Sequence, residues 1–168
     1  MSFLTPQDTR FAASPETLNW QCETFDALQA YTLYRIIKAR VDVFVVEQNC
    51  PYPELDDEDQ AALHVQGYGI QGLAGYARIL PPDADGQVFI GRILTTAPYR
   101  GRGVGKTLMA EALRWAAEAY PNAELCLAAQ AQLEDFYACF GFAVSGPEYL
   151  EDNILHVPMR RAVGSKTV

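Results

Sequence analysis

The chain has 168 residues, enough for one ordinary domain with a buried core and too few for two. Hydrophobic residues make up 49% of it and charged residues 20%, which is typical of a globular protein rather than a disordered one. Lys and Arg number 13 against 21 Asp and Glu, so the net charge is −8. This balance disfavours nucleic acid as a partner, because phosphates require a positive surface.

The first residues carry no basic segment followed by an apolar stretch, so we expect no secretory signal. No apolar run approaches the roughly 18 residues of a membrane-spanning helix. The four cysteines are widely spaced without a CxxC pair, and there are only two histidines, which disfavours a structural zinc site. We therefore predict a cytoplasmic protein with reduced thiols, no metal and no membrane partner.

We predict one domain at residues 19–163, between a loose N-terminal tail at 1–18 and a polar C-terminal tail at 164–168. Hydrophobic periodicity predicts a strand at 20–25, a helix from Asp26 or Thr32 to Phe44, strands at 63–68, 73–80 and 88–95, a helix at 104–119, a strand at 124–128, a helix at 133–140 and a strand at 154–160. The β-branched end of the first helix, at 43–46, is ambiguous. This order predicts a mixed α/β sheet with an antiparallel front half.

The most informative segment links the strand at 88–95 to the helix at 104–119 and reads Arg100-Gly101-Arg102-Gly103-Val104-Gly105-Lys106-Thr107. Glycines let backbone N–H groups approach a ligand closely, and the start of the following helix favours an anion. The three cations in the same turn, Arg100, Arg102 and Lys106, predict a phosphate group as the ligand. The Walker A and GxGxxG spacings both fail, because Arg100, Lys106 and Leu108 stand where those motifs require glycine.

Three motifs in the right order resemble one enzyme family. Arg-x-x-Gly-x-Gly at Arg100, Gly103 and Gly105 resembles the pyrophosphate loop of the GNAT superfamily of N-acetyltransferases, and Gln130, Phe136-Tyr137 and 140–142 resemble the second half of its signature. The segments 43–52, 91–93 and 129–132 resemble more narrowly the bacterial ElaA-like subgroup. The resemblance spans roughly residues 25–162. It implies a single-domain α/β fold, with a mixed, largely antiparallel sheet flanked by helices and with splayed central strands.

The resemblance also implies acetyl-CoA as the acyl donor, and direct attack by a small amine while both substrates are bound. The implied cofactor contacts are Ile93, Leu94 and Thr95 for the pantetheine arm, Arg100, Gly101, Arg102, Gly103, Val104, Gly105, Lys106 and Thr107 for the phosphates, and Gln130 and Tyr137 beside the arm. Tyr137 stands where the superfamily often places the acid that protonates the CoA thiolate. At position 130 the superfamily more often has Asn, so Gln130 departs from its pattern.

The resemblance does not identify the general base, because members of the superfamily use different residues for this role. Our candidates are Glu47 and His64, with Asp56 and Asp57 as weaker ones. Glu47 alternatively ends a helix or pairs with Arg92, and His64 alternatively is a structural histidine with satisfied hydrogen bonds.

The acidic run at 54–59 and Cys50 each allow two interpretations. The acidic run is either solvated surface or a means of attracting a cationic substrate. Cys50 is a buried thiol or, less favoured, a nucleophile.

Two further functions are compatible with the sequence. One is a non-catalytic CoA-binding sensor or subunit, and the other is an acyltransferase that uses a longer acyl donor. The sequence leaves the oligomeric state open, and a homodimer is one possibility.

Overall fold

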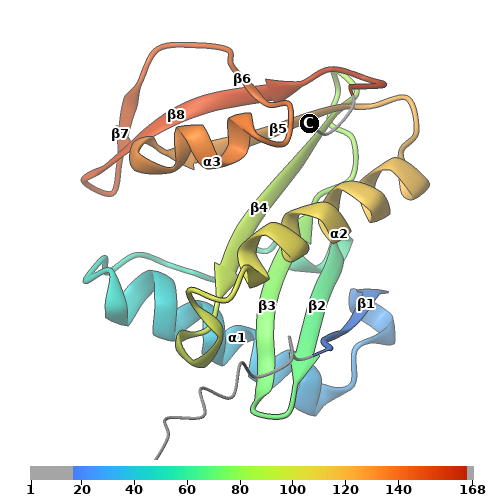
Figure 1. Cartoon of the computed structure of the whole chain (residues 1–168), viewed down its shortest axis with the longest axis vertical. Coiled ribbons are helices and arrows are strands. Elements are labelled where there is room, and N and C mark those ends of the chain that lie inside the picture. Colours follow the sequence, from blue (N-terminus) through green and yellow to red (C-terminus); the bar gives the residue numbers. More distant parts are fainter. Residues whose placement is uncertain (1–16, 166–168) are drawn as a thin grey trace, which may run out of the picture.

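Eight strands form one continuous sheet in the computed structural model, which describes residues 17–165 (Figure 1). The strands are β1 (Asn19–Thr24), β2 (Leu63–Gly69), β3 (Gly72–Ile79), β4 (Gln87–Thr95), β5 (Glu124–Gln130), β6 (Ala143–Val144), β7 (Tyr149–Glu151) and β8 (Ile154–Arg161). Their order is β1-β2-β3-β4-β5-β8-β6, with β7 also paired to β8. Among the described strands only β4 and β5 are parallel neighbours, which confirms the predicted mixed, largely antiparallel sheet. The predicted tails fall largely outside the described residues.

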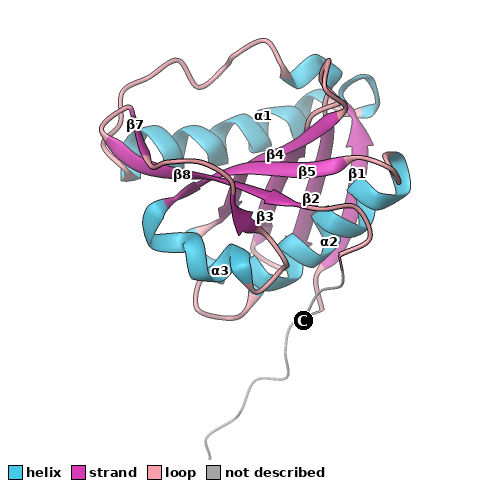
Figure 2. Ribbon diagram, turned by 90° about the horizontal axis from the view of Figure 1, so that it is seen from above, coloured by secondary structure: helices cyan, strands magenta, loops and turns pink. Residues whose placement is uncertain are grey.

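Helices cover both faces of the sheet. They are α1 (Ala30–Arg40), α2 (Val104–Ala119) and α3 (Glu134–Ala138), with short helical turns at η1 (Phe25–Ala27), η2 (Val41–Glu47), η3 (Asp59–Ala61), η4 (Ala97–Tyr99) and η5 (Ala131–Leu133). Figure 2 shows α1 on one face and α2 and α3 on the other. None of the helices described between residues 17 and 165 is both long enough and apolar enough to cross a membrane.

The apolar stripes of the helices explain this layering. In α2 the side chains of Leu108, Met109 and Ala112 are completely buried in the larger core, as the helical period of the sequence predicts. On the other face Ile36 of α1 packs into a second apolar cluster with Tyr76 of β3. Two apolar cores of different size therefore lie on opposite faces of the sheet.

The parallel pair β4 and β5 separates soon after it forms. The two strands pair only from Gln87, opposite Glu124, to Phe89, opposite Cys126. Beyond these positions β4 continues to Thr95 and β5 to Gln130 without pairing to each other. Figure 1 shows the resulting V, in which β4 leads down towards α1 and β5 stays beside β8. The predicted splay of the central strands is confirmed, and it opens the sheet at its centre.

The structure resolves one ambiguity and departs from the predicted elements elsewhere. The end of the first helix, which the sequence left ambiguous, is a wide helical turn, η2. The predicted helix at 133–140 is shorter, as α3, and β6 and β7 were not predicted. Both strands are too short to show alternation. The turn from β7 to β8 is made by Asp152 and Asn153, whose φ angles of 48° and 63° are the positive values of a tight hairpin turn.

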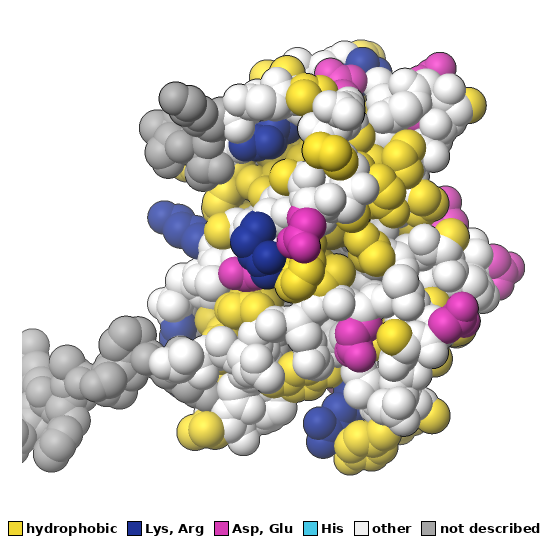
Figure 3. Space-filling model, turned by 90° about the vertical axis from the view of Figure 1, so that its right-hand side faces the viewer, with side chains coloured by type: hydrophobic (Ala, Val, Ile, Leu, Met, Phe, Trp, Pro, Cys, Tyr) yellow, Lys and Arg dark blue, Asp and Glu magenta, His cyan; other side chains and the backbone are white. Residues whose placement is uncertain are grey.

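Charged side chains of both signs are scattered over one face of the molecule, shown in Figure 3. On the face shown in Figure 3, Lys and Arg side chains lie among acidic and apolar ones. Along α2, Arg114 forms ion pairs with Glu111 and Glu118. The described part of the face in Figure 3 therefore carries no continuous basic surface.

Candidate active site

A cavity of about 970 Å³ occupies the gap between β4 and β5. Its walls come from segments far apart in the sequence. They include Ile93, Leu94 and Thr95 of β4, Arg100 and Gly105 of the glycine-rich loop, Phe136 and Tyr137 of α3, Glu47, Gln48, Cys50, Tyr52, Asp56 and Glu58 of the segment from η2 to η3, and Glu151, Asp152, Ile154 and His156 around the β7–β8 turn. The cavity thus runs from the glycine-rich loop to the β7–β8 turn.

The glycine-rich loop has the backbone geometry of an anion site. Gly101 and Gly103 have φ angles of 72° and 79°, in the region that only glycine enters without strain. Gly103 is the residue before α2, and the backbone N–H groups of 101–103 donate to no acceptor within residues 17–165. Arg102 and Lys106 form no ion pair in this range either. Free N–H donors, two unpaired cations and a helix start are the groups that hold a phosphate.

Arg100 connects this loop to η2. Its Nη1 and Nη2 donate to both carboxylate oxygens of Glu47 at 2.6 and 3.0 Å, and its Nε donates to the carbonyl oxygen of Thr95 at 2.9 Å. The hydrogen bonds from Arg100 hold the pKa of Glu47 below its usual range. The predicted alternative partner of Glu47 was Arg92, and this pairing is wrong because Arg92 turns to Glu54 and Asp56 instead.

Gln130 joins the end of β5 to the segment after η2. Its Nε2 donates to Oε1 of Gln48 at 3.1 Å, and its own Oε1 accepts from Gln132 at 2.8 Å. Both ends of the Gln130 amide are therefore engaged with other side chains at the edge of the cavity.

Tyr137 lies at the cavity wall and is otherwise enclosed by apolar rings. Its exposed fraction is 6%, and Phe136 and Phe142 contact it edge to face. Burial raises the pKa of Tyr137 to about 12, so the hydroxyl stays protonated at neutral pH. No hydrogen bond to this hydroxyl exists among the described residues. The side chain lines the cavity, and its hydroxyl is a proton donor to which residues 17–165 offer no acceptor.

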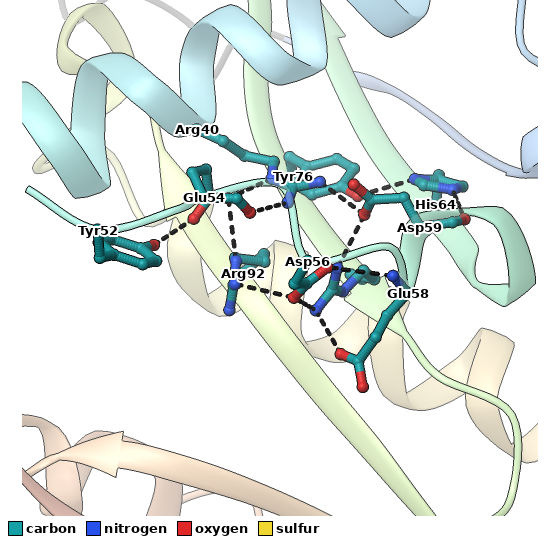
Figure 4. Close-up of polar contacts among 10 residues, drawn as sticks. Arg40, Tyr52, Glu54, Asp56, Glu58, Asp59, His64, Tyr76 and Arg92 are labelled. Carbon is teal, nitrogen blue, oxygen red and sulfur yellow. Dashed lines mark hydrogen bonds and ion pairs between the residues drawn. The ribbon is translucent and has the colours of Figure 1, made fainter. Parts of the chain in front are cut away.

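His64 is not brought to the cavity. It is completely buried in β2, its Nε2 lies 3.0 Å from the carbonyl oxygen of Asp59, and its Nδ1 lies 2.8 Å from the hydroxyl of Tyr76 (Figure 4). A carbonyl oxygen only accepts, so Nε2 carries the proton and Nδ1 accepts from the tyrosine. Burial also lowers the pKa of His64. Both nitrogens are satisfied, which corresponds to a structural histidine and leaves no free lone pair for a substrate.

Part of the acidic run belongs to a charge network: Glu54 and Asp59 are buried in it and Asp56 is half-buried, whereas Asp57 and Glu58 are exposed (Figure 4). Arg40, which is 1% exposed, donates to Glu54 and Asp59, and Arg78 donates to Asp56 at 2.6 and 2.7 Å and to Asp59 at 2.9 Å. Hydrogen bonds from Arg78 hold the pKa of Asp56 far below its usual range, which makes this carboxylate a weak base.

Asp57 lies outside both the network and the cavity. Its backbone has a φ of 61° in an exposed turn.

Residues 17–165 contain no group of three or more His, Cys, Asp or Glu arranged to hold a metal ion.

A β-bulge shapes the β4 wall. Tyr76 pairs with Leu94 and Arg78 with Gly91, so Ala77 of β3 faces both Arg92 and Ile93. Arg92 takes a φ of 52°, a strained value for a residue with a side chain. The bulge turns Arg92 towards Glu54 and Asp56, at 2.9 and 3.0 Å, and breaks the regular pairing of β4 beside the cavity.

Several cavity residues were not among the sequence candidates. Gln48 lies in the segment 43–52 that resembles the ElaA-like subgroup, but it was given no role. Glu151, Asp152 and His156 belong to no local motif and reach the cavity only through the β7–β8 hairpin. The available signal was the pair Asp152-Asn153 before the strand at 154–160, because such residues favour a tight hairpin turn.

Comparison with known proteins agrees with this arrangement. The family model described as "Acetyltransferase (GNAT) domain" matches residues 28–163. The chain belongs to this family, and it is an acyltransferase with an acyl-CoA cosubstrate.

Two proteins show the similarity in detail. Protein ElaA of Escherichia coli (strain K12) is 39% identical over 149 residues, which cover 87% of this chain and 97% of ElaA. The crystal structure of Escherichia coli ElaA superposes with a TM-score of 0.82, covering 86% of this chain and 99% of that one. An acyl-CoA N-acyltransferase from Pseudomonas aeruginosa superposes with a TM-score of 0.84 at 39% identity, covering 87% and 100%.

The fold alone is shared more widely. The AHL synthase LasI has a TM-score of 0.72 but only 17% identity, covering 90% of this chain and 93% of that one.

Proposed function

We propose that the protein transfers an acetyl group from acetyl-CoA to a small cationic amine by direct attack, with both substrates bound together. The observation that carries the proposal is the continuity of the cavity. The same 970 Å³ space is lined by Gly105 at the phosphate end and by Glu151 and Asp152 at the other end. A donor and an acceptor that enter from these ends meet near Tyr137, and holding two reactants together supplies much of the acceleration of such a reaction.

The donor half has the groups that a CoA ester requires. The free N–H groups of 101–103, with Arg102 and Lys106, suit the pyrophosphate. Because no described strand pairs with β4 on its β5 side beyond Phe89, backbone groups of Ile93 to Thr95 are available to the pantetheine arm, apart from the carbonyl oxygen of Thr95, which accepts from Arg100. A backbone N–H near Leu94 would stabilise the oxyanion.

Tyr137 is the proposed acid. Its high pKa, about 12, keeps the proton on the hydroxyl until the thiolate leaves. Its place on the cavity wall suits this role, as does a hydroxyl that forms no hydrogen bond with any residue from 17 to 165.

The acceptor half is acidic, which suits a cationic amine. The carboxylates that line the cavity are Glu47, Asp56, Glu58, Glu151 and Asp152, against the cations Arg78, Arg92 and Arg100. We assign Glu47 to this attraction and to holding Arg100 in place. It is a poor general base, because two hydrogen bonds from Arg100 stabilise its charged form.

A turnover screen tests the proposal. Purified protein is incubated with acetyl-CoA and with polyamines, amino acids, aminoglycosides and peptides, and the released thiol is measured. We expect turnover with amines that carry a second positive charge, and little with anionic ones. Acyl-CoA esters of increasing chain length, run in parallel, test the choice of donor. Tight CoA binding without thiol release for any amine would overturn the proposal in favour of a binding subunit.

A further inference from the structure

His156 of β8 lies on the face of the sheet that lines the cavity. It is paired with Gln130 of β5 and with Tyr149 of β7, and directly paired residues place their side chains on the same face. Ile154, two residues earlier in β8, shares this face. Gln130, Ile154 and His156 all line the cavity.

The ring of His156 is held in one orientation and one tautomer. It stacks on the ring of Tyr149, with centroids 6.0 Å apart and planes 29° from parallel. Its Nδ1 lies 2.9 Å from the carbonyl oxygen of Ile154. Since a carbonyl oxygen only accepts, the neutral ring carries its proton on Nδ1 and its lone pair on Nε2. No residue between 17 and 165 forms a hydrogen bond with Nε2.

Three carboxylates of the cavity are engaged in ion pairs. Glu47 is bound by Arg100 at both oxygens, and Asp56 is bound by Arg78 and Arg92. Glu58 accepts from Arg78 at 3.0 Å. Each of these carboxylates would have to give up an ion pair to accept a proton.

Two cavity carboxylates, Glu151 and Asp152 at the β7–β8 turn, form neither a hydrogen bond nor an ion pair with the described residues. Carboxylates are charged and weakly basic at neutral pH, whereas histidine is the side chain that exchanges a proton between about pH 5 and 8. Efficient proton transfer needs a group matched to the working pH. The two carboxylates suit attraction of the amine, and the histidine suits its deprotonation.

We propose that His156 is the general base of the reaction, an inference that rests on the proposed function. Nε2 takes one proton from the ammonium group of the acceptor, and the neutral amine attacks the thioester carbon. The new C–N bond forms, the C–S bond breaks, and Tyr137 gives its proton to the leaving sulfur. The second proton lost by the amine nitrogen restores Tyr137, and the imidazolium of His156 releases the first proton to solvent.

The test is the pH dependence of kcat/KM for the best amine of the screen, in the parent and in His156→Asn. Asparagine keeps an N–H donor at the position of Nδ1, so the bond to Ile154 is retained while the base is lost. We expect kcat/KM at neutral pH to fall about 100-fold. The two curves should converge at high pH, where the amine loses its proton unaided, and acetyl-CoA affinity by calorimetry should stay within about twofold.

Tyr149 of β7 and Gln130 of β5 are paired with His156, and Gln130 carries no charge. Glu151, two residues after Tyr149 in β7, lies on the same face, and Asp152 of the turn lines the same cavity. The matched control is Glu151→Gln on the same face. It should lower kcat/KM for cationic amines while retaining the acidic limb of the parent profile.

A His156→Asn profile that matches the parent, or lies below it by a constant factor at every pH, overturns the assignment. Should the asparagine variant fail to fold, His156→Ala with added imidazole replaces it. Recovery of turnover supports the base, and a folded alanine variant that imidazole does not rescue overturns it. If the parent turns over no amine, the proposed function itself fails, and the assignment falls with it.

Discussion

Gln48 and Gln130 lie 82 positions apart in the sequence and are joined by a hydrogen bond of 3.1 Å from Nε2 of Gln130 to Oε1 of Gln48. The bond links the segment that follows η2, on the proposed acceptor side, to the last residue of β5, beside the proposed path of the pantetheine arm. Neighbouring Glu47 is bound to Arg100 of the glycine-rich loop. Two consecutive residues of the proposed acceptor side therefore each contact a residue of the proposed cofactor site.

The first prediction concerns this hydrogen bond. Gln48→Ala and Gln130→Ala should each weaken acetyl-CoA binding a few-fold, because either change leaves the other amide without its partner. The double variant should bind no worse than the weaker single variant, with a coupling energy of about 1 kcal/mol. Calorimetric titration of the four proteins measures the cycle. Strictly additive losses would show that the bond does not link the two sides.

The second prediction concerns the phosphate loop. A Cβ at Gly105 would meet only Thr95 Oγ1 at 3.7 Å and Phe136 Cζ at 3.8 Å, which are ordinary contacts. Gly105→Val should therefore fold, yet bind acetyl-CoA at least 10-fold more weakly, since its branches occupy space beside the helix start where a phosphate would bind. Ala110→Val, on the exposed face of the same helix, is the control for adding a branched residue. Unchanged affinity in folded Gly105→Val would exclude this loop as the phosphate site.

The third prediction is that Tyr137→Phe lowers kcat by roughly 10- to 100-fold while acetyl-CoA affinity stays the same. The ring keeps its contacts with Phe136 and Phe142, and the lost hydroxyl forms no hydrogen bond with the described part of the chain, so the melting temperature should barely change. Single-turnover kinetics would locate the loss in the chemical step. Full activity would make Tyr137 a core residue and assign the thiolate proton to another group or to water.

Local patterns were sufficient to predict most of the fold. The glycine-rich loop could be identified because all its groups are contiguous, and the α2 stripe because burial follows the helical period. The splay of β4 and β5 came from the family resemblance rather than from any residue pattern. The two short strands β6 and β7 could not be predicted, because two or three residues show no alternation of apolar and polar side chains.

The candidate bases could not be assigned from the sequence, for a physical reason. Whether a carboxylate or an imidazole is a free base depends on its partners, and these come from distant segments. Glu47 forms hydrogen bonds with Arg100, which lies 53 positions away in the sequence. His64 forms hydrogen bonds with Tyr76 and Asp59, which lie on neighbouring elements. His156 faces the cavity only because β8 pairs with both β5 and β7. None of these relationships leaves a local pattern.

The fourth prediction concerns the stability of the charge network. Arg40→Met leaves Glu54 and Asp59 buried with one arginine fewer each, and should lower the free energy of unfolding by roughly 3 kcal/mol. Lys38→Met removes an exposed pair with Asp42, and because exposed ion pairs contribute little to stability it should lower the free energy of unfolding far less than Arg40→Met does. Urea unfolding at neutral pH compares the two variants. Equal costs would contradict a structural role for the network.

The same network predicts how stability depends on pH. Hydrogen bonds from Arg78 lower the pKa of Asp56; burial opposes the ionisation of Asp59, yet hydrogen bonds from Arg40 and Arg78 lower its pKa too. Carboxylates with depressed folded-state pKa values stabilise the fold above their unfolded pKa of about 4, and this contribution is lost as the pH falls further. The free energy of unfolding should therefore drop as the pH falls from about 5 to about 3, and less steeply in Arg40→Met.

The last prediction separates Glu47 from the general base. Because Arg100 lowers its pKa, Glu47 takes up a proton only at a pH more acidic than usual, and it stays charged throughout the neutral range. It therefore cannot produce an acidic limb near neutral pH. Glu47→Gln keeps an oxygen that accepts from Arg100 and removes only the charge. We expect kcat/KM for a cationic amine to fall about 10-fold, mainly at low salt, with the shape of the pH profile unchanged.

The control is Glu118→Gln, which removes one charge from the exposed face of α2, away from the residues that line the cavity. It should leave kcat/KM near the parent value at every salt concentration. An acidic limb that disappears in Glu47→Gln would make Glu47 the base and remove that role from His156. A Glu47→Gln variant as active as the parent on every amine would instead show that the Glu47–Arg100 pair serves only to hold η2 against the phosphate loop.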